Sequence, residues 1–129
     1  MRLNQVTVAT HDVERAIAFY RALGLELIVH SPHYARFVCP DGRCTFSVHR
    51  TDAPIATTTV VYFECDDLDA KVSELKRAGL TFDSDPADQP WLWREARLSD
   101  PDGNPLCLYY AGTNRIDPPW RVHADSTIA

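Results

Sequence analysis

The chain has 129 residues, of which 45% are apolar and 24% charged, and a formal net charge of −5 at pH 7. This composition is typical of a folded globular protein and excludes a disordered chain. The acidic balance and the absence of a basic patch argue against nucleic acid as a partner, because phosphate binding needs clustered Lys and Arg. No apolar run in the sequence approaches the ~20 residues of a membrane span, so we expect no membrane partner. The N-terminal residues lead directly into a strand pattern, and we therefore expect no signal peptide and a cytoplasmic location.

The first half of the chain predicts a strand, a helix and three further strands. Residues 3–10 alternate polar and apolar side chains, as a half-buried strand does. Asp12 is placed to cap a helix, and Gly24 is placed to end it. Between them, apolar residues recur at helical spacing: Val13, Ala16, Ile17, Tyr20 and Leu23. The further strands are predicted at residues 25–30, 34–39 and 44–49.

The second half repeats this order after a polar linker at residues 51–58. A strand at residues 59–65 precedes a helix that Asp67 caps and Gly79 ends. The predicted buried stripe of this helix is Leu68, Val72, Leu75 and Ala78. Two more strands are predicted, at residues 90–98 and 106–110. Cap and stop are twelve positions apart in both halves, and each half has an Asp-Gly turn before its last strand, which indicates an internal duplication.

The predicted fold class is therefore α+β, with two β-α-β-β-β modules at residues 3–50 and 59–110 of one domain, 1–129. One helix cannot cover both faces of its sheet. The uncovered faces of the curved mixed sheets should turn toward each other, or toward a partner subunit, and form a cleft. The tail at residues 111–129 shows neither a helix nor a strand pattern. Its Pro-Pro-Trp run favours an extended segment that lies across its own module or a second subunit.

Four segments carry a resemblance to a known family: residues 6–15 (VTVATHDVER), 19–25 (FYRALGL), 63–70 (FECDDLDA) and 100–105 (DPDGNP). With them the chain resembles the vicinal oxygen chelate superfamily. That superfamily includes glyoxalase I, extradiol dioxygenases, fosfomycin-modifying enzymes and bleomycin-binding resistance proteins. The resemblance covers residues 3–110 and implies the two-module fold. It does not imply one reaction, because a single fold supports many chemistries.

The resemblance also implies a divalent metal, held by His, Glu or Gln side chains from four strands. The four implied ligand positions fall on Gln5, Ser47, Val60 and Cys107. Only Gln5 keeps the usual ligand chemistry, and a catalytic metal usually needs three protein ligands. We therefore expect no metal and no other cofactor. An alternative is a shifted ligand set, which would make the protein a lyase, an isomerase or a dioxygenase: Gln5, His49, Glu64 and Cys107.

Without a metal, the cleft is interpreted as a binding surface. The residues predicted to contact a ligand are Gln5, Thr7, Ser47, His49, Tyr62, Trp93, Arg97, Cys107 and Tyr109. Trp and Tyr supply flat surfaces for an aromatic ligand, and Arg97 is suited to an anionic group. In the alternative interpretation, the tryptophans pack between the modules and Arg97 pairs with Glu95. Cys107 is either a buried apolar filler or a nucleophile whose pKa His49 or Arg97 would have to lower.

The leading hypothesis is a metal-independent small-molecule-binding protein that forms a homodimer. The sequence assigns no catalytic residue. The alternatives are a metal-dependent enzyme of the same superfamily and a structural or regulatory dimer with no ligand in its cleft. The cysteines at positions 39, 44, 65 and 107 lack the CxxC spacing of a zinc site. Cys39 and Cys44 flank a predicted turn and could face each other across a hairpin, although we expect them to be reduced in a cytoplasmic protein.

Overall fold

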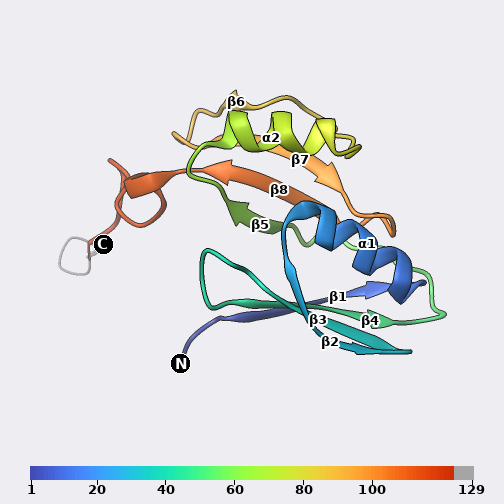
Figure 1. Cartoon of the computed structure of the whole chain (residues 1–129). Helices are drawn as coiled ribbons and strands as arrows, with labels where there is room; N and C mark the ends of the chain where they lie inside the picture. The colour runs from blue at the N-terminus through green and yellow to red at the C-terminus, as the bar shows by residue number, and fades with distance from the viewer. Residues whose placement is uncertain (124–129) are drawn as a thin grey trace.

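The computed structural model describes residues 1–123, so the end of the predicted tail, residues 124–129, lies outside the described residues. The first module contains β1 (Gln5–Thr10), α1 (Val13–Leu23), β2 (Glu26–Ser31), β3 (Tyr34–Val38) and β4 (Thr45–Arg50). The second contains β5 (Val61–Glu64), α2 (Leu68–Arg77), β6 (Ala87–Asp88), β7 (Arg94–Ser99) and β8 (Pro105–Tyr110), and a 3-10 turn, η1 (Gly112–Arg115), follows (Figure 1). In the described part of the chain, no helix has the length and apolar character needed to cross a membrane.

The strands form two mixed four-stranded sheets, in the orders β1-β4-β3-β2 and β5-β8-β7-β6. In each sheet the first strand of the module runs parallel to its last strand, and the other neighbours are antiparallel. The predicted α+β fold with two β-α-β-β-β modules is thus confirmed. Except for the strand predicted at residues 90–98, strand ends differ from the prediction by at most two residues; β5, for example, begins at Val61 rather than at residue 59.

Both helices begin and end where the local signals predict. The side chains of Asp12 and Asp67 each accept a hydrogen bond of 3.1 Å from the backbone N–H three residues further on. Gly24 ends α1 with a φ of 114°, a left-handed conformation that favours glycine. The predicted apolar stripe of α1 is buried throughout. The stripe of α2 was predicted one residue too long, because Ala78 lies beyond the last helical turn and is exposed.

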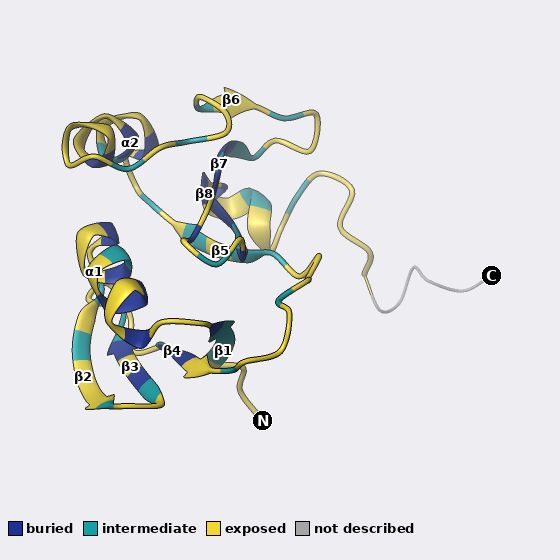
Figure 2. Cartoon of the chain, turned by 90° about the vertical axis from the view of Figure 1, so that its right-hand side faces the viewer, coloured by how far each residue is buried: buried dark blue, intermediate teal, exposed yellow. Residues whose placement is uncertain are grey.

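The helix-covered faces of both sheets share one hydrophobic core. Phe46 of β4 lies at its centre, with its ring centroid 4.6 Å from that of Tyr20 and 5.9 Å from that of Phe63 in the other module. Figure 2 shows α1 and α2 on the same side of the molecule, each packed on one face of its own sheet. Because the covered faces meet in this core, the uncovered faces of the two sheets point outward and away from each other.

The turn between β7 and β8 clamps the second module onto the first. The Asp102 carboxylate accepts hydrogen bonds from the Thr10 hydroxyl (2.5 Å) and from Arg15 Nη2 (2.9 Å). Asn104 Nδ2 donates to the carbonyl oxygen of Ala9 (2.9 Å). Asp100 is also buried and accepts a hydrogen bond of 2.6 Å from Tyr20. The turn that the sequence marks as a loop is therefore a main contact between the modules.

The strand predicted at residues 90–98 is wrong in its first part. Residues 89–93 form a turn between the short strand β6 and β7, in which the Gln89 N–H donates to the Trp93 carbonyl oxygen (2.8 Å). Pro90 suits such a turn because its φ is fixed, and Leu92 takes a left-handed φ of 66°. The continuous apolar run at residues 90–93 suggested a strand, but its backbone hydrogen bonds close a loop.

The tail begins as a 3-10 turn at Gly112–Arg115, which the sequence analysis did not predict, before the Pro-Pro-Trp run. Glu64 Oε2 accepts hydrogen bonds from the backbone N–H groups of Ala111 (2.9 Å) and Gly112 (3.0 Å). The carbonyl oxygen of Asn114 accepts a hydrogen bond of 3.2 Å from Trp93 Nε1. These bonds hold the start of the tail against its own module, while Trp120 further along is 55% exposed.

Candidate functional site

The residues predicted to contact a ligand lie on the uncovered faces of two different sheets. We call the first set the polar face: Gln5, Thr7, Tyr34, Arg36, Ser47 and His49. We call the second set the aromatic face: Tyr62, Trp93, Glu95, Arg97, Cys107 and Tyr109. Each set is held together by its own contacts. Within residues 1–123, no hydrogen bond or ring contact joins one set to the other, so the two sets form separate clusters.

A hydrogen-bonded network organises the polar face around Ser47, which is fully buried. The Ser47 hydroxyl accepts a bond of 2.8 Å from Gln5 Nε2 and shares one of 2.6 Å with the Tyr34 hydroxyl. Arg36 Nε donates to the same Tyr34 oxygen (2.9 Å). Burial acts to raise the pKa of Tyr34, but the bonds to Ser47 and Arg36 outweigh it and lower that pKa.

Tyr34 and Arg36 were missed by the sequence analysis. The alternation of residues 34–38 places these two side chains on one face, but which face depends on the pairing of β3 with β4. In the structure, Tyr34 pairs with His49 and Arg36 pairs with Ser47. A correct register between the two strands would therefore have found both residues. His49 itself is exposed at the end of β4.

Three aromatic rings in mutual contact dominate the aromatic face. Trp93 and Tyr109 lie nearly parallel, at an interplanar angle of 20° and a centroid distance of 4.6 Å. Tyr62 meets both rings edge-on, at 5.9 Å and 5.5 Å. Tyr109 is buried, whereas Tyr62 remains 41% exposed. The cluster thus offers a preformed, partly open aromatic surface, which binds flat apolar groups well.

A buried carboxylate adjoins this cluster. Glu95 is 4% exposed, and it accepts hydrogen bonds from Trp91 Nε1 (2.8 Å) and Arg97 Nη2 (3.1 Å). Arg97 Nη2 also donates to the Tyr62 hydroxyl (3.2 Å), and its guanidinium lies 5.6 Å from the centre of that ring. The pairing of Arg97 with Glu95 that the alternative interpretation named is therefore present. The bond from Trp91 was not foreseen, because it depends on the turn at residues 89–93.

Cys107 lies fully buried beside Glu95. Burial and the negative charge of Glu95 raise the pKa of its thiol to about 12, and the nearby Arg97 offsets this only in part. His49, which was considered as a base for this thiol, lies on the other sheet. A thiol that stays protonated at neutral pH is a poor nucleophile, so the filler interpretation of Cys107 is the better supported one.

We predict that Cys107 resists alkylation. At about pH 8, iodoacetamide should label Cys107 at least ~100-fold more slowly than the exposed Cys44, since the thiolate is the reactive form. Peptide mapping by mass spectrometry after timed quenching measures both rates in one sample. Labelling in denaturant is the control, and there the two rates should become equal. Comparable rates in the folded protein would contradict the assignment of Cys107 as an inert filler.

The four implied ligand positions do not fit a divalent metal. The amide of Gln5 is engaged by Ser47, Thr7 and Thr45. Val60 has no donor atom and packs against the buried Cys107. The shifted ligand set does not fit a metal within one chain either. Its members are divided between the two faces, and the Glu64 carboxylate accepts hydrogen bonds from the backbone at the start of η1. Among the described residues, no group of three or more His, Cys, Asp and Glu side chains converges on a metal-binding geometry.

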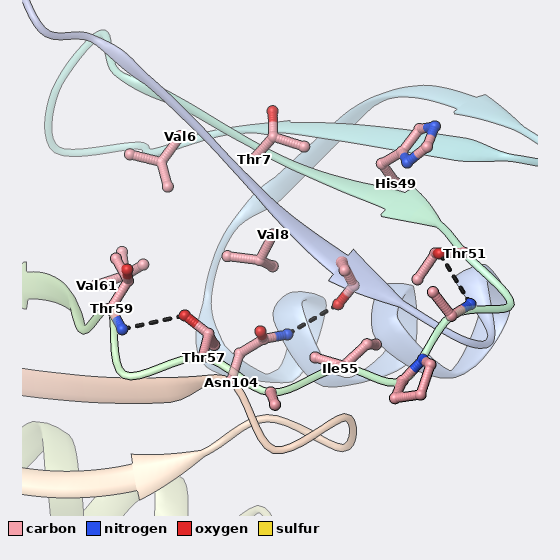
Figure 3. Close-up of a pocket in the computed structure, with 14 residues that line it drawn as sticks. Val6, Thr7, Val8, His49, Thr51, Ile55, Thr57, Thr59, Val61 and Asn104 are labelled. Atoms are coloured by element: carbon pink, nitrogen blue, oxygen red, sulfur yellow. Dashed lines mark hydrogen bonds between the residues drawn. The ribbon is translucent and has the colours of Figure 1, made fainter.

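A pocket of about 480 Å³ lies beside the polar face, between the edge of β1 and the linker that joins the modules (Figure 3). Thr7 and His49 border it on one side, Ile55 of the linker on another, and Asn104 beneath. It lies at the junction of the two modules. The aromatic face contributes no residue to it, so in one chain the stacked rings form an open wall.

A family model described as "Glyoxalase/Bleomycin resistance protein/Dioxygenase superfamily" matches residues 2–108 of the chain. The chain belongs to this superfamily. The match spans both modules, from the residues before β1 to the third residue from the end of β8. The resemblance drawn from the sequence motifs is thereby confirmed. No curated protein matches the chain at a significant level.

Solved structures of the superfamily share the fold at low identity. A glyoxalase/bleomycin resistance protein/dioxygenase from Nocardioides superposes with a TM-score of 0.76 at 22% identity, over 95% of this chain and 90% of that one. Lactoylglutathione lyase from Agrobacterium tumefaciens gives 0.71 at 20% identity, over 84% and 92%. A bleomycin-binding protein in complex with bleomycin gives 0.70 at 22% identity, over 85% and 98%. Superfamily neighbours thus include both a lyase and a binding protein.

Proposed function

We propose that this chain is a metal-independent binding protein for small molecules, of the glyoxalase/bleomycin-resistance type, and that it acts as a cytoplasmic homodimer. The observation that carries the proposal is the aromatic face. Trp93 and Tyr109 are stacked there, Tyr62 meets both rings edge-on, and the Arg97 guanidinium lies over the Tyr62 ring. The bleomycin-binding neighbour supports a binding role for this fold.

The chemistry of the face favours an aromatic ligand with an anionic group. The exposed edge of the ring cluster offers stacking, which is worth about 0.5–1.5 kcal/mol per ring pair beyond the area it buries. Arg97 uses Nη2 for its bonds to Glu95 and Tyr62. The remaining N–H donors of the same planar guanidinium would pair with a carboxylate, sulfonate or phosphate group.

A homodimer supplies the second wall of the site. Ligand pockets bury most of the surface of a small molecule, and one open sheet face cannot do so. The two uncovered faces of a chain point away from each other, so the polar face of one subunit would cover the aromatic face of its partner. Twofold symmetry then produces two equal sites per dimer. Tyr62 and Trp91, 41% and 45% exposed in one chain, would be covered in that arrangement.

The metal-dependent enzyme and the ligand-free structural dimer predict different contents of the purified protein. Elemental analysis of protein made without a polyhistidine tag tests the first. About one divalent metal per chain would refute the proposal and favour the enzyme. Mass spectrometry of compounds released on denaturation tests the second, since a binding protein retains a small molecule that a structural dimer lacks.

We predict that Trp93→Ala weakens binding of anilinonaphthalene sulfonate, an aromatic anion, by about 3–10-fold, because one stacking partner is lost. Fluorescence titration gives the Kd. The matched control is Tyr110→Ala, since Tyr110 is 43% exposed on β8 but lies on the opposite face from Tyr109. Equal losses for both variants, or none for Trp93→Ala, would place the ligand elsewhere.

A further inference from the structure

Two cysteines face each other across the hairpin that joins β3 and β4. Val38 pairs with Thr45 at the end of the ladder, which makes Cys39 and Cys44 the next pair of opposite residues. The backbone confirms this, because the Cys39 N–H donates to the Cys44 carbonyl oxygen (3.0 Å). The Gly42 N–H then closes the turn on the Cys39 carbonyl oxygen (3.2 Å). Opposite residues of a ladder have their side chains on the same face.

This position is geometrically suited to a disulfide. Opposite residues of a hydrogen-bonded antiparallel pair have Cα atoms about 5.5 Å apart. Disulfides span Cα distances of roughly 4.4–6.8 Å, most often near this value. The two sulfurs also interact electrostatically: burial raises the pKa of Cys39, and the neighbouring Cys44 and Asp41 raise it further. Both thiols are free in the structure, with Cys44 exposed and Cys39 half-buried.

We propose that Cys39 and Cys44 are a reversible dithiol–disulfide pair that a hydroperoxide oxidises. The exposed Cys44 thiolate attacks the outer peroxide oxygen, and an S–O bond forms as the O–O bond breaks. The other oxygen leaves as hydroxide or alkoxide and takes up the proton that the Cys44 thiol released, which gives water or an alcohol. Cys39 then attacks the Cys44 sulfur. The S–S bond forms as the S–O bond breaks, and the released hydroxide takes the Cys39 proton to become water. Overall, two thiols lose two electrons and two protons, and the peroxide gains them.

The other two cysteines do not share this chemistry. Cys107 is fully buried under Val60 and the aromatic rings. Cys65 follows β5 in the second module, where its N–H donates to the Tyr109 carbonyl oxygen (2.8 Å), so its neighbour on the next strand is a tyrosine and not a cysteine. A disulfide at the hairpin would also be easily reduced, because a cellular thiol can reach the exposed Cys44 sulfur and exchange with it. In a reducing cytoplasm, such a pair is oxidised only when peroxide is present.

Oxidation would fix the end of the hairpin beside the polar face. Thr45, the residue after Cys44, donates its hydroxyl hydrogen bond to Gln5 Oε1. Its backbone N–H donates to the Asn4 carbonyl oxygen (2.8 Å). A covalent bridge one residue away would reduce the opening of this strand end. The amide of Thr45 is therefore expected to exchange its hydrogen more slowly in the oxidised protein.

The test treats the full chain with hydrogen peroxide, blocks remaining thiols with N-ethylmaleimide and maps the peptides. We expect a mass loss of two hydrogen atoms per chain, located in a linked Cys39–Cys44 peptide and reversed by dithiothreitol. Cys39→Ser should prevent the bridge and leave a sulfenic acid on Cys44 that dimedone traps. Cys65→Ser and Cys107→Ser are the matched controls and should form the bridge at the wild-type rate.

Three results would overturn the proposal. The first is oxidation of Cys44 to the sulfinic acid without a bridge in the wild-type protein. The second is a bridge that contains Cys65, and the third is a disulfide between two chains on a non-reducing gel. Since the peptide map and the non-reducing gel of the wild-type protein together distinguish all three from the expected bridge, the test does not depend on how well the serine variants fold.

Discussion

Replacement of Asp100 by alanine is expected to lower the free energy of unfolding by about 3–5 kcal/mol. The carboxylate is 5% exposed and accepts four hydrogen bonds. One comes from the Tyr20 hydroxyl (2.6 Å), one from the Asp102 N–H (2.9 Å), and two from the backbone and side chain of Asn104 (2.9 Å each). Alanine would leave these buried donors unpaired and release the turn that joins the modules. Urea denaturation followed by circular dichroism measures the loss.

Two controls separate this effect from ordinary side-chain loss. Tyr20→Phe removes a single donor to Asp100 and should cost about 1 kcal/mol. Asp52→Ala breaks an exposed ion pair with Arg50 and should change stability by less than about 0.5 kcal/mol. If Asp100→Ala costs no more than Tyr20→Phe, the turn does not act as a clamp between the modules.

The hydrogen bond from Tyr20 to Asp100 also makes the stability of the fold depend on pH in the alkaline range. Burial, followed by the nearby negative charge of Asp100, raises the pKa of Tyr20 above its ordinary value. The folded state holds this proton more tightly than the unfolded state. The contribution of the protonated Tyr20 to the free energy of unfolding is therefore complete below about pH 10 and is lost as the pH rises further. Tyr20 therefore remains a donor to Asp100 throughout the neutral range.

The sequence predicted those parts of the fold that depend on local chemistry. A capping carboxylate such as Asp12, a helix stop such as Gly24 and the apolar spacing between them act within a few residues of chain, so each can be recognised without knowledge of the rest. The repetition of these signals in order identified the duplication. Where local signals conflicted, the prediction failed. Residues 90–93 are an apolar run that suggested a strand, but Pro90 begins a turn.

The site was less predictable because its geometry depends on contacts between distant segments. Alternation along a strand indicates that Ser47 and Tyr109 each lie on an uncovered face, but it does not say where those faces point. That direction is set by the packing of Phe46 on Phe63, which brings the covered faces together. The hydrogen bond from Trp91 to Glu95 depends in the same way on the turn at residues 89–93, which the sequence analysis predicted as a strand.

The largest functional effect is expected from mixing two variants that each bind the ligand weakly on their own. Thr7→Arg fills the polar face with a long charged side chain at an exposed position, and Trp93→Ala removes a stacking ring from the aromatic face. Each homodimer should bind anilinonaphthalene sulfonate weakly, because both of its sites contain one altered face. After the two variants are unfolded together and refolded as a mixture, binding should return to about a quarter of the wild-type capacity.

This recovery follows from the symmetry of the proposed dimer. Random pairing makes about half of the dimers mixed, and a mixed dimer has one site with both faces altered and one site with both faces intact. The control is the same mixture kept below the concentration at which the chains associate, where no recovery is expected. If each chain instead built its site from its own two faces, every chain would carry one altered face and mixing would restore nothing. Fluorescence titration of the refolded mixture therefore decides between a site shared by two subunits and one formed within a single chain.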